Sequence, residues 1–351
     1  MEKLWKYKKI GEVCIVERGA SPRPIDKYIT DNESGINWIK IGDTSDSMYI
    51  TETAQKIIVE GMKKSRYVKP GDFLLSNSMS FGRPYILKID GCIHDGWLVL
   101  RDENALFDKR FLYYYLSSKT TYKKLKSMAV GGVVNNLNSE MVRNVIVPVP
   151  DKEEQSEIAD LFDKIKKILD DRKQELEQLD TLVKSRFAEM FGDVKYGTER
   201  WGGKPFKDIT INLDSKRKPV KDADRKKMQG IYPYYGATGI VDYVNDYRQD
   251  GDFLLISEDG KALELRSKPI AFLASGKIWV NNHAHVQQCT DECNMIYLMY
   301  HINFMDISIW VTGIDQKKLN RANLDIIPIA LPPIELQNQF ADFVVSVDKS
   351  K

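Results

Sequence analysis

The sequence is short of cysteine and of long apolar runs. Its four cysteines are scattered over 351 residues, at Cys14, Cys92, Cys289 and Cys293. This usage is typical of free thiols in a reducing compartment. No apolar run approaches the roughly 18 residues of a membrane span, and the N-terminal MEKLWKYKKI lacks the pattern of a secretory signal. We therefore expect a cytoplasmic protein that does not enter the membrane.

Neither sign of charge predominates. Lys and Arg number 52 and Asp and Glu 50, which gives a formal net charge of +2. This balance is not that of a polybasic nucleic-acid tail, but a basic groove can exist on a nearly neutral protein. At 351 residues, the chain is long enough for two domains of ordinary size.

Catalytic motifs are also lacking. Gly260-Lys261 and Gly276-Lys277 have neither the upstream glycine nor the following Ser or Thr of a P-loop. No Gly-x-Gly-x-x-Gly follows a strand-like run, and the Asn-Pro-Pro-Tyr/Phe tetrapeptide of methyltransferases is absent. Pro150-Asp151 with Asp171-x-Lys173 matches a nuclease pattern, but the later residues fall on the polar face of a predicted helix, where charges are usually solvated. We expect no catalytic residue.

One cluster has ligand types suited to zinc. His283-x-His285 lies near Cys289 and Cys293 in the sequence. Two of these ligands would come from one strand-like run, and the first half of the chain has no matching set. A polar loop followed by buried free thiols is the simpler interpretation, so we expect no metal site.

The longest regular pattern runs from Asp151 to about Gly192. It contains no Pro, its first Gly is Gly192, and acidic residues crowd its start, where they complement the helix dipole. Its apolar residues recur in steps of four and three, interrupted by Arg172 and Arg186, which is typical of a coiled-coil seam. The seam residues are Ile158, Phe162, Ile165, Leu169, Leu176, Leu179, Val183 and Met190. Such a helix spans on the order of 60 Å, more than one ordinary domain, so a long amphipathic helix on a single core is the less favoured alternative.

The chain repeats itself at a shift of 182 residues, the distance from Gly131 to Gly313. Residues 131–165 align with 313–347 without a gap. The matched motifs are Leu137-Asn138 with Leu319-Asn320 and Glu153-x-Gln155 with Glu335-x-Gln337. A period of domain size indicates duplication of a whole module rather than a solenoid.

The rest of the chain fits two modules on one plan. Short strand-like runs are expected at Val13–Val16, Trp38–Ile41, Phe73–Leu75, Tyr85–Ile89 and Trp97–Leu100, and helices at Asp108 to about Met128 and Cys289 to about Asp306. Phe206–Ile209 echoes Tyr7–Ile10, and Gly251–Leu255 repeats Gly71–Leu75. We expect an α+β fold with two similar mixed α/β domains, 1–150 and 194–332. The long coiled-coil helix, 151–193, joins them, and 333–351 begins a second, short helix.

Basic loops and amide-rich turns suggest contact with a polymer. Lys216–Lys221 is a basic loop, and Arg23 lies between prolines at a similar place in the first module; such loops suit phosphate contacts. Pro233–Gly239 places two tyrosines in a turn, and Val280–His285 groups amide and imidazole side chains that can bond to base edges. Each alone is an ordinary turn, but in duplicate they favour a nucleic-acid surface.

Loop position and side-chain chemistry give a set of predicted DNA contacts. In the first module they are Arg23, Lys40, Asn77, Ser78, Arg83, His94, Asn135 and Asn136. In the second they are Lys216, Arg217, Lys218, Tyr234, Tyr235, Lys261, Asn281, Asn282, His283, Gln316 and Lys317.

This arrangement resembles the specificity subunit of a type I restriction–modification system. The resemblance rests on Leu137-Asn138, Val147–Pro150 and Glu153-x-Gln155-x-x-Ile158-Ala159. The second copy reads Leu319-Asn320, Leu331–Pro333 and Glu335-x-Gln337-x-x-Phe340-Ala341. The Pro-Tyr-Tyr-Gly-Ala-Thr-Gly and Asn-Asn-His-Ala-His runs also look typical of target recognition domains. The resemblance covers essentially the whole chain.

The resemblance implies a non-catalytic subunit that binds a bipartite double-stranded DNA target, each recognition domain reading one half. Two modification subunits would dock on the helices and recognition domains, carry S-adenosylmethionine and methylate adenine N6 after flipping the base out. Restriction subunits, which use ATP and Mg, can join the complex. This chain would itself bind no cofactor. In such subunits the antiparallel helices act as a ruler for the unread spacer.

The short second helix departs from that family pattern. Four residues follow Val347, which leaves Leu176 to Met190 without an evident mate. A second copy of the chain, the modification subunits or residues lost by truncation would complete the seam.

Two other functional classes are weighed against this one. An enzyme that fuses a recognition domain to a nuclease or methyltransferase needs the catalytic motifs that are absent. A scaffold whose duplicated modules bind protein or carbohydrate is the remaining alternative. A steep fall of binding with added salt would favour DNA over that scaffold.

Overall fold

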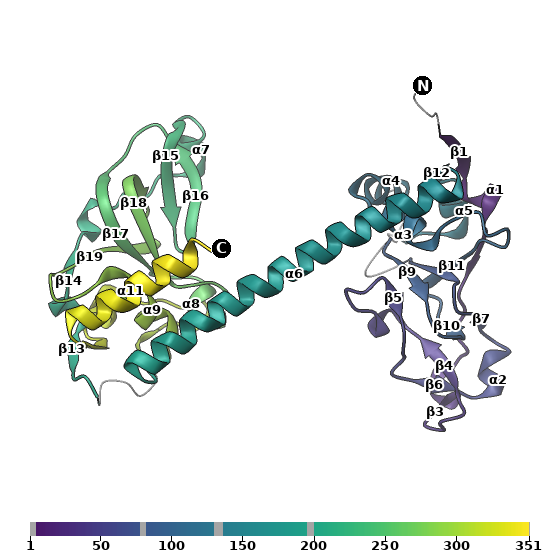
Figure 1. Cartoon of the computed structure of the whole chain (residues 1–351), viewed down its shortest axis with the longest axis horizontal. Helices are drawn as coiled ribbons and strands as arrows, with labels where there is room; N and C mark the ends of the chain where they lie inside the picture. The colour runs from purple at the N-terminus through teal and green to yellow at the C-terminus, as the bar shows by residue number, and fades with distance from the viewer. Residues whose placement is uncertain (1–4, 78–81, 130–135, 195–199, 351) are drawn as a thin grey trace. The chain divides into compact units, whose positions relative to one another are not determined.

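The chain divides into two compact units, Met1–Asp171 (unit 1) and Arg172–Lys351 (unit 2). The computed structural model describes residues 5–77, 82–129, 136–194 and 200–350 (Figure 1). Helix α6 (Lys152–Phe191) belongs to both units. Within the described ranges, no helix combines the length and the apolar character that crossing a bilayer requires.

The described part of unit 1 forms three sheets. A two-stranded sheet pairs β1 (Lys6–Lys9) with β12 (Ile146–Val149). The second sheet has the order β2 (Ile15–Arg18), β11 (Trp97–Arg101), β8 (Phe73–Ser76), β9 (Pro84–Leu87), β5 (Tyr49–Ile50). The third has the order β3 (Ile29–Thr30), β6 (Lys56–Ile57), β4 (Ile36–Ile39), β10 (Gly91–Ile93), β7 (Arg66–Val68).

The helices of unit 1 are α1 (Ile10–Val13), α2 (Val59–Met62), α3 (Lys109–Ser117), α4 (Lys119–Ala129), α5 (Ser139–Arg143) and the start of α6, with 3-10 turns at Ile25–Lys27 and Ile41–Asp43. All of these helices but α2 contribute to the core around β8 and β11, whereas Met62 of α2 packs on a separate cluster that contains Trp38 and Ile57. The single helix predicted from Asp108 to Met128 is wrong, because Ser118 leaves the helical conformation (φ −63°, ψ 145°). The Ser118 hydroxyl instead accepts a hydrogen bond from the Thr121 amide (3.2 Å), as a residue that starts a new helix does.

Unit 2 has the same kinds of element. Here β13 (Gly203–Pro205) pairs with β20 (Pro328–Ala330). A six-stranded sheet has the order β14 (Thr210–Asn212), β19 (Ala284–Cys289), β17 (Gln249–Ser257), β18 (Ala271–Val280), β15 (Gln229–Gly236), β16 (Gly239–Val244). The helices are α7 (Asp222–Arg225), α8 (Ala262–Leu265), α9 (Met295–Phe304), α10 (Arg321–Asp325), α11 (Ile334–Asp348) and the end of α6, with 3-10 turns at Phe206–Asp208, Asp214–Lys216 and Ser308–Trp310.

The sequence repeat reappears in the strand pairing of the two units. The pairs β1–β12 and β13–β20 are antiparallel, as are β8–β11 and β17–β19, whereas β4–β10 and β15–β18 are parallel. In unit 2, β18 pairs with both β17 and β15. In unit 1 two different strands make the corresponding pairings: β9 pairs with β8, and β10 pairs with β4. β9 and β10 lie in separate sheets. The frame is therefore shared while the middles differ.

One predicted match between the modules is shifted. The Ile10 amide donates to the Val145 carbonyl (2.8 Å), and the Phe206 amide donates to the Ile327 carbonyl (2.9 Å), at equivalent places in the repeat. Ile10 and Phe206 are both buried, whereas Tyr7 is 61% exposed. Phe206 thus corresponds to Ile10 and not to Tyr7, because Phe206 and Ile10 share both burial and the hydrogen bond to an equivalent carbonyl.

Helix α6 confirms the predicted long helix, and it ends at Gly192 (φ +88°). Figure 1 shows α11 beside the end of α6. Val183 and Phe187 pack there with Phe340 and Val344 of α11. The prediction that Leu176–Met190 lacks a mate is therefore wrong, because α11 runs antiparallel to α6 and covers that end.

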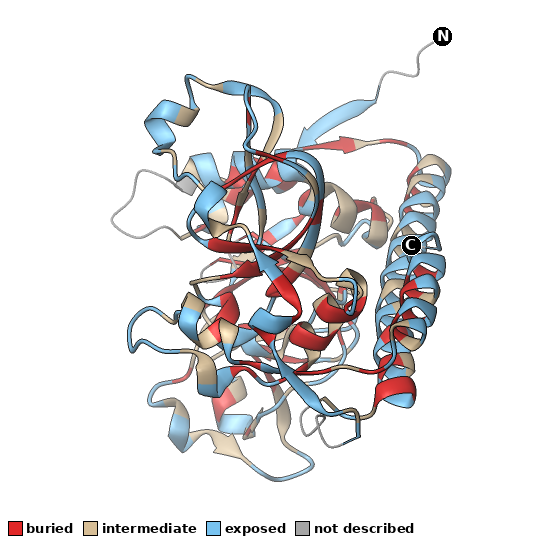
Figure 2. Cartoon of the chain, turned by 90° about the vertical axis from the view of Figure 1, so that its left-hand side faces the viewer, coloured by how far each residue is buried: buried red, intermediate tan, exposed pale blue. Residues whose placement is uncertain are grey.

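The exposed part of the seam lies at the start of α6 instead. Phe162, Ile165 and Leu169 are 45%, 43% and 64% exposed in unit 1. Figure 2 accordingly draws much of the long helix as exposed.

The core of unit 2 contains an uncharged histidine. His301 on α9 is 2% exposed, and its Nε2 accepts a hydrogen bond from the Ala330 amide (3.2 Å). Burial lowers the pKa of His301 from 6.5 to about 4.

We expect acid to destabilise unit 2 through His301. Between pH 6.5 and about 4 the unfolded chain binds a proton at this residue and the folded chain does not, so the free energy of unfolding falls as the pH falls. The loss reaches about 3 kcal/mol at pH 4. Urea unfolding at pH 7 and pH 4 measures it. His301→Gln, which keeps an acceptor for Ala330, should lose this part of the pH dependence, and an unchanged dependence would contradict the assignment.

Candidate nucleic-acid interface

A buried glutamine at the start of α6 joins that end of the helix to the loop before α3. The Gln155 side-chain oxygen accepts a hydrogen bond from the Asp108 amide (2.8 Å). Its side-chain nitrogen donates to the carbonyls of Leu106 (3.1 Å) and Pro150 (2.9 Å). Asp108 is also the N-cap of α3, so Gln155 fixes the start of two helices at once.

Gln337 makes the same three contacts at the start of α11. It accepts from the amide of Asn294 (2.8 Å), the N-cap of α9, and donates to the carbonyls of Glu292 (3.1 Å) and Pro332 (2.7 Å). Like Gln155, Gln337 is 0% exposed. The Glu-x-Gln motif that repeats in the sequence therefore belongs to the frame, not to a binding surface.

The repeated Leu-Asn motif attaches a loop to that frame. Asn138 and Asn320 cap α5 and α10 with their side-chain oxygens. The leucine before each is buried, and its amide donates to the carbonyl that follows a central strand. These pairs are Leu137 with Asn77 (3.1 Å) and Leu319 with Glu258 (2.8 Å).

In unit 2 several polar loops meet at one place, which we call the unit 2 loop surface. It consists of residues 214–221, 236–239, 258–261, 281–284 and 313–319. The Glu258 amide donates to the His283 carbonyl (2.9 Å), and the Gly260 amide donates to the Lys317 carbonyl (3.2 Å). These bonds bring the loop after β17 against the loops before β19 and before α10.

The basic loop after β14 and the turn between β15 and β16 join the same surface. The Lys218 amide donates to the Val280 carbonyl (3.1 Å), and the Trp279 indole donates to the Lys218 carbonyl (2.7 Å). The Ser257 hydroxyl donates to the Ala237 carbonyl (2.5 Å). Segments far apart in the sequence thus present one continuous surface.

Most of the contacts predicted for the second module lie on this surface. Lys216, Lys218, Lys261, Asn282, His283 and Gln316 are exposed, and Arg217 and Lys317 are partly buried. Lysines and amides on one surface can neutralise phosphates and bond to base edges.

Three predicted contacts have supporting positions instead. Tyr234 is 1% exposed, and its hydroxyl accepts from the Val220 amide (2.9 Å), so it holds the basic loop from inside. Asn281 is 7% exposed and accepts from the His283 amide (2.8 Å). Tyr235 is partly buried and stacks on Phe272, with the ring centroids 6.0 Å apart.

A network of charged side chains lies beneath the unit 2 loop surface. The Arg217 guanidinium donates to Glu258 (2.6 Å) and lies 3.4 Å from Asp214. The His285 ring contacts Asp214 (2.7 Å), and the Lys318 ammonium lies 3.1 Å from Glu258. His285 is 1% exposed, and the side chains of Asp214 and Glu258 are 11% and 13% exposed.

Both carboxyl groups of the network are held ionised. Burial would raise the pKa of Asp214 and of Glu258, but the hydrogen bonds and charges of His285 and Arg217 outweigh it and lower both pKa values below their ordinary range. The Val286 amide also donates to Asp214 (2.8 Å).

The geometry of His285 does not suit zinc. Its Nδ1 faces the carboxylate of Asp214, and its Nε2 faces the carbonyl oxygen of Leu319 (2.9 Å), so neither nitrogen is left for a metal. The His283 Nδ1 contacts the Asp259 carboxylate (2.8 Å). Among the residues that the structure describes, no three His, Cys, Asp or Glu side chains are grouped as a metal site.

In unit 1 the predicted contacts gather around Asp95. Its carboxylate accepts from the Ser21 hydroxyl (2.8 Å) and the Arg23 guanidinium (3.3 Å), and its carbonyl accepts from the Asn77 side chain (2.8 Å). Burial would raise the pKa of Asp95, but the hydrogen bond from Ser21, a backbone hydrogen bond and the nearby His94 and Arg23 together lower it. Asn77 is 1% exposed, so it supports this cluster from inside.

The other predicted residues of unit 1 are less closely grouped. His94 is partly buried, and burial lowers its pKa. Lys40 bonds to Gln55 (2.8 Å), and exposed Arg83 lies 3.7 Å from Asp46. Asn136 is partly buried beside Leu137, whereas Ser78 and Asn135 fall outside the described residues.

Sequence reasoning missed the carboxylates of both clusters. Asp95, Asp214 and Glu258 carry no motif, and a search for DNA contacts favours cations and amides. The available signal was His285 itself, because a histidine in a strand-like run needs a polar partner once it is buried.

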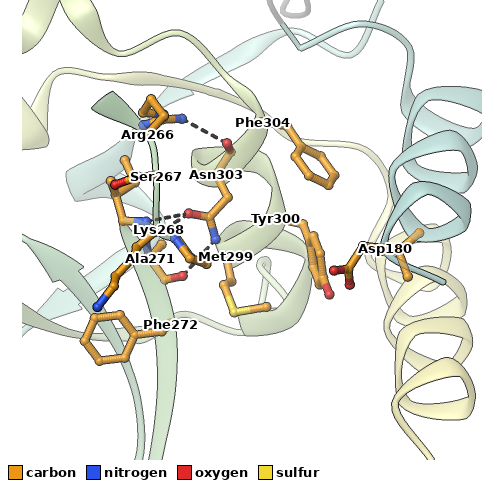
Figure 3. Close-up of a pocket in the computed structure, with 13 residues that line it drawn as sticks. Asp180, Arg266, Ser267, Lys268, Ala271, Phe272, Met299, Tyr300, Asn303 and Phe304 are labelled. Carbon is orange, nitrogen blue, oxygen red and sulfur yellow. Dashed lines mark hydrogen bonds between the residues drawn. The ribbon is translucent and has the colours of Figure 1, made fainter. Parts of the chain in front are cut away.

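A cavity of about 480 Å³ lies elsewhere in unit 2 (Figure 3). The Asn303 side chain accepts from the Ile270 amide (2.9 Å) and donates to the Ala271 carbonyl (2.8 Å), and the Arg266 guanidinium donates to the Asn303 carbonyl (2.9 Å). These polar groups hold the backbone, and no residue that lines the cavity belongs to the unit 2 loop surface.

Both units of the chain are covered by matches to one protein family. Residues 2–179 and 199–351 match the family model of the type I restriction modification DNA specificity domain. The chain belongs to this family. As in other specificity subunits, its part is not a catalytic one.

Its curated relatives are specificity subunits of type I restriction enzymes. One from Haemophilus influenzae is 38% identical over 136 residues, which are 39% of this chain and 34% of that protein. MjaIX from Methanocaldococcus jannaschii is 25% identical over 54% of this chain, so the chain spans less than half of each of these two relatives. EcoprrI from Escherichia coli is 22% identical over 97% of this chain and 86% of that protein.

Solved specificity subunits share the fold. The subunit from M. genitalium superposes with a TM-score of 0.60 at 15% identity, covering 99% of this chain and 90% of that one. A chain from a structure concerned with assembly and conformational transition of the type I system gives a TM-score of 0.56 at 14% identity, over 99% and 90% of the two chains.

Proposed function

We propose that the chain binds a bipartite DNA target, one half with each unit, and directs adenine-N6 methylation by partner modification subunits in the cytoplasm. S-adenosylmethionine would be bound by those partners, and restriction subunits with ATP and Mg would join them. The observation that carries the proposal is the duplicated frame, in which Gln155 and Gln337 make identical contacts while the loops around Asp95 and Glu258 differ. Different loops on one frame suit the reading of two different half-sites.

The chemistry of the unit 2 loop surface supports DNA rather than protein as the partner. Lys216, Lys218 and Lys261 are exposed cations suited to phosphates, which give affinity without sequence. Asn282 and Gln316 are exposed amides that can bond to base edges in pairs. Each half would then be read over a few base pairs.

Methylome sequencing tests this function directly. Cells that express the chain with the modification subunit encoded beside it should gain N6-methyladenine at a split motif, with methylated adenines in both halves. A single palindromic motif would mean that one unit is used twice. No new methylation with well-expressed subunits would contradict the proposal.

Lysine substitutions supply the matched comparison for the same experiment. Lys216→Ala with Lys218→Ala should lower methylation at all sites and weaken the salt dependence of binding, by about one released counterion for each phosphate that the variant no longer neutralises. Lys207→Ala is the control. Lys207 is also an exposed lysine, but it lies before β14, whereas the basic loop lies after the other end of that strand. Binding that is insensitive to salt would favour a protein or carbohydrate scaffold.

A further inference from the structure

The charged network beneath the unit 2 loop surface contains one residue that touches two of its loops from inside. His285 lies in β19, and its two ring nitrogens point to the loop after β14, at Asp214, and to the loop before α10, at Leu319. Its side chain is 1% exposed, so it cannot itself contact DNA.

Both ring nitrogens of His285 face oxygen atoms on other loops. Nε2 lies 2.9 Å from the Leu319 carbonyl oxygen, which can only accept a hydrogen bond. Nδ1 lies 2.7 Å from Asp214, which also receives a hydrogen bond from the Val286 amide and faces the Arg217 guanidinium. The ring of His285 therefore joins two loops through its two nitrogens.

The same network reaches the remaining polar loops. Arg217 links Asp214 to Glu258 and to the Ala284 carbonyl (3.0 Å). Glu258 in turn holds the exposed Lys318 and lies 3.8 Å from the His285 ring. The loops that present Lys216, Lys261 and Gln316 thus share one buried ionic centre.

We propose that His285 is the positioning residue of the unit 2 loop surface, holding its cations and amides at the spacing that reads one DNA half-site. The inference rests on the proposed function and names the residue on which the geometry of that reading depends. A side chain that makes two hydrogen bonds to one base edge discriminates between bases. This discrimination is lost when the side chain is displaced, so it depends on loops that are already held in place.

Selection from a pool of duplexes with 40 randomised base pairs, bound by the full chain and sequenced, tests this role. Wild-type protein should enrich a two-part motif. His285→Gln, which replaces a ring with two nitrogens by an amide with one nitrogen, should keep one half of the motif and lose about tenfold or more of the preference at the other. His301→Gln is the matched control, because it replaces another buried histidine of unit 2 whose ring contacts none of these loops.

The outcomes separate positioning from folding. Both halves retained in His285→Gln would overturn the proposal, and so would an equal loss in His301→Gln, which would indicate general destabilisation. A wild-type protein that enriches no motif would instead overturn the proposed function itself, leaving His285 no half-site to position.

Discussion

Replacing Gln155 with leucine is expected to lower the free energy of unfolding of unit 1 by about 3 to 5 kcal/mol. Leucine has a similar volume but makes no hydrogen bond. The Asp108 amide and the carbonyls of Leu106 and Pro150 would lose the partner that Gln155 supplies. Each buried polar group left unsatisfied costs about 1–3 kcal/mol. Gln337→Leu should have the same effect on unit 2, since its three contacts are equivalent.

Hydrogen exchange followed by mass spectrometry distinguishes the two variants. Gln155→Leu should reduce protection in peptides of unit 1 and Gln337→Leu in peptides of unit 2, with the other unit as internal reference. Gln174→Leu is the control, because Gln174 is exposed on α6 and its replacement should change stability by less than about 0.5 kcal/mol. Equal losses in the exposed and buried variants would contradict the role assigned to the buried glutamines.

Replacing Phe187 with alanine is expected to destabilise unit 2 by about 3–5 kcal/mol. Phe187 is 1% exposed where α6 meets α9 and α11. Its ring stacks on Tyr297 with centroids 5.6 Å apart and meets the edge of Phe340 at 5.1 Å. Alanine would remove both contacts and leave a cavity that a packed aromatic cluster fills only in part.

Urea unfolding compares this variant with one from the same helix. Leu182 is 48% exposed, so Leu182→Ala should cost less than about 1 kcal/mol. A similarly small cost for Phe187→Ala would mean that the α6–α11 seam contributes little to unit 2.

The long helix could be predicted from sequence because its signals are local. Its bounds, Lys152–Phe191, follow from the absence of Pro and Gly and from a stop at Gly192, whose positive φ suits glycine. Which part of the apolar seam of this helix is covered by another helix could not be predicted in the same way. The partner of Phe187 lies over 150 residues away in the sequence, and the direction of packing decides whether Phe340 meets the start or the end of α6.

The candidate site shows a similar division. The exposure of loop cations such as Lys216 could be predicted, because a cluster of basic residues beside proline in the sequence indicates a solvent-exposed loop. The inward positions of Tyr234 and Asn77 could not be predicted, because Tyr234 lies in β15 rather than in the predicted turn, and the face to which a residue points is decided only when its strand is placed in the sheet. The break in the predicted helix at Ser118 was also missed. The Ser118 hydroxyl competes with the helical backbone for the hydrogen bond of the Thr121 amide.

The hydrogen-bond partners described for Gln155 and Gln337 are all backbone atoms, which has a consequence for how such genes can recombine. Backbone amides and carbonyls are the same in every unit, whatever side chains its loops carry. Genetic recombination within the aligned stretch from Leu137 to Gln155, or from Leu319 to Gln337, would exchange a whole set of loops while each glutamine met chemically identical partners. A lineage of such genes can therefore acquire a new loop set in one crossover, with no compensating mutation at these contacts.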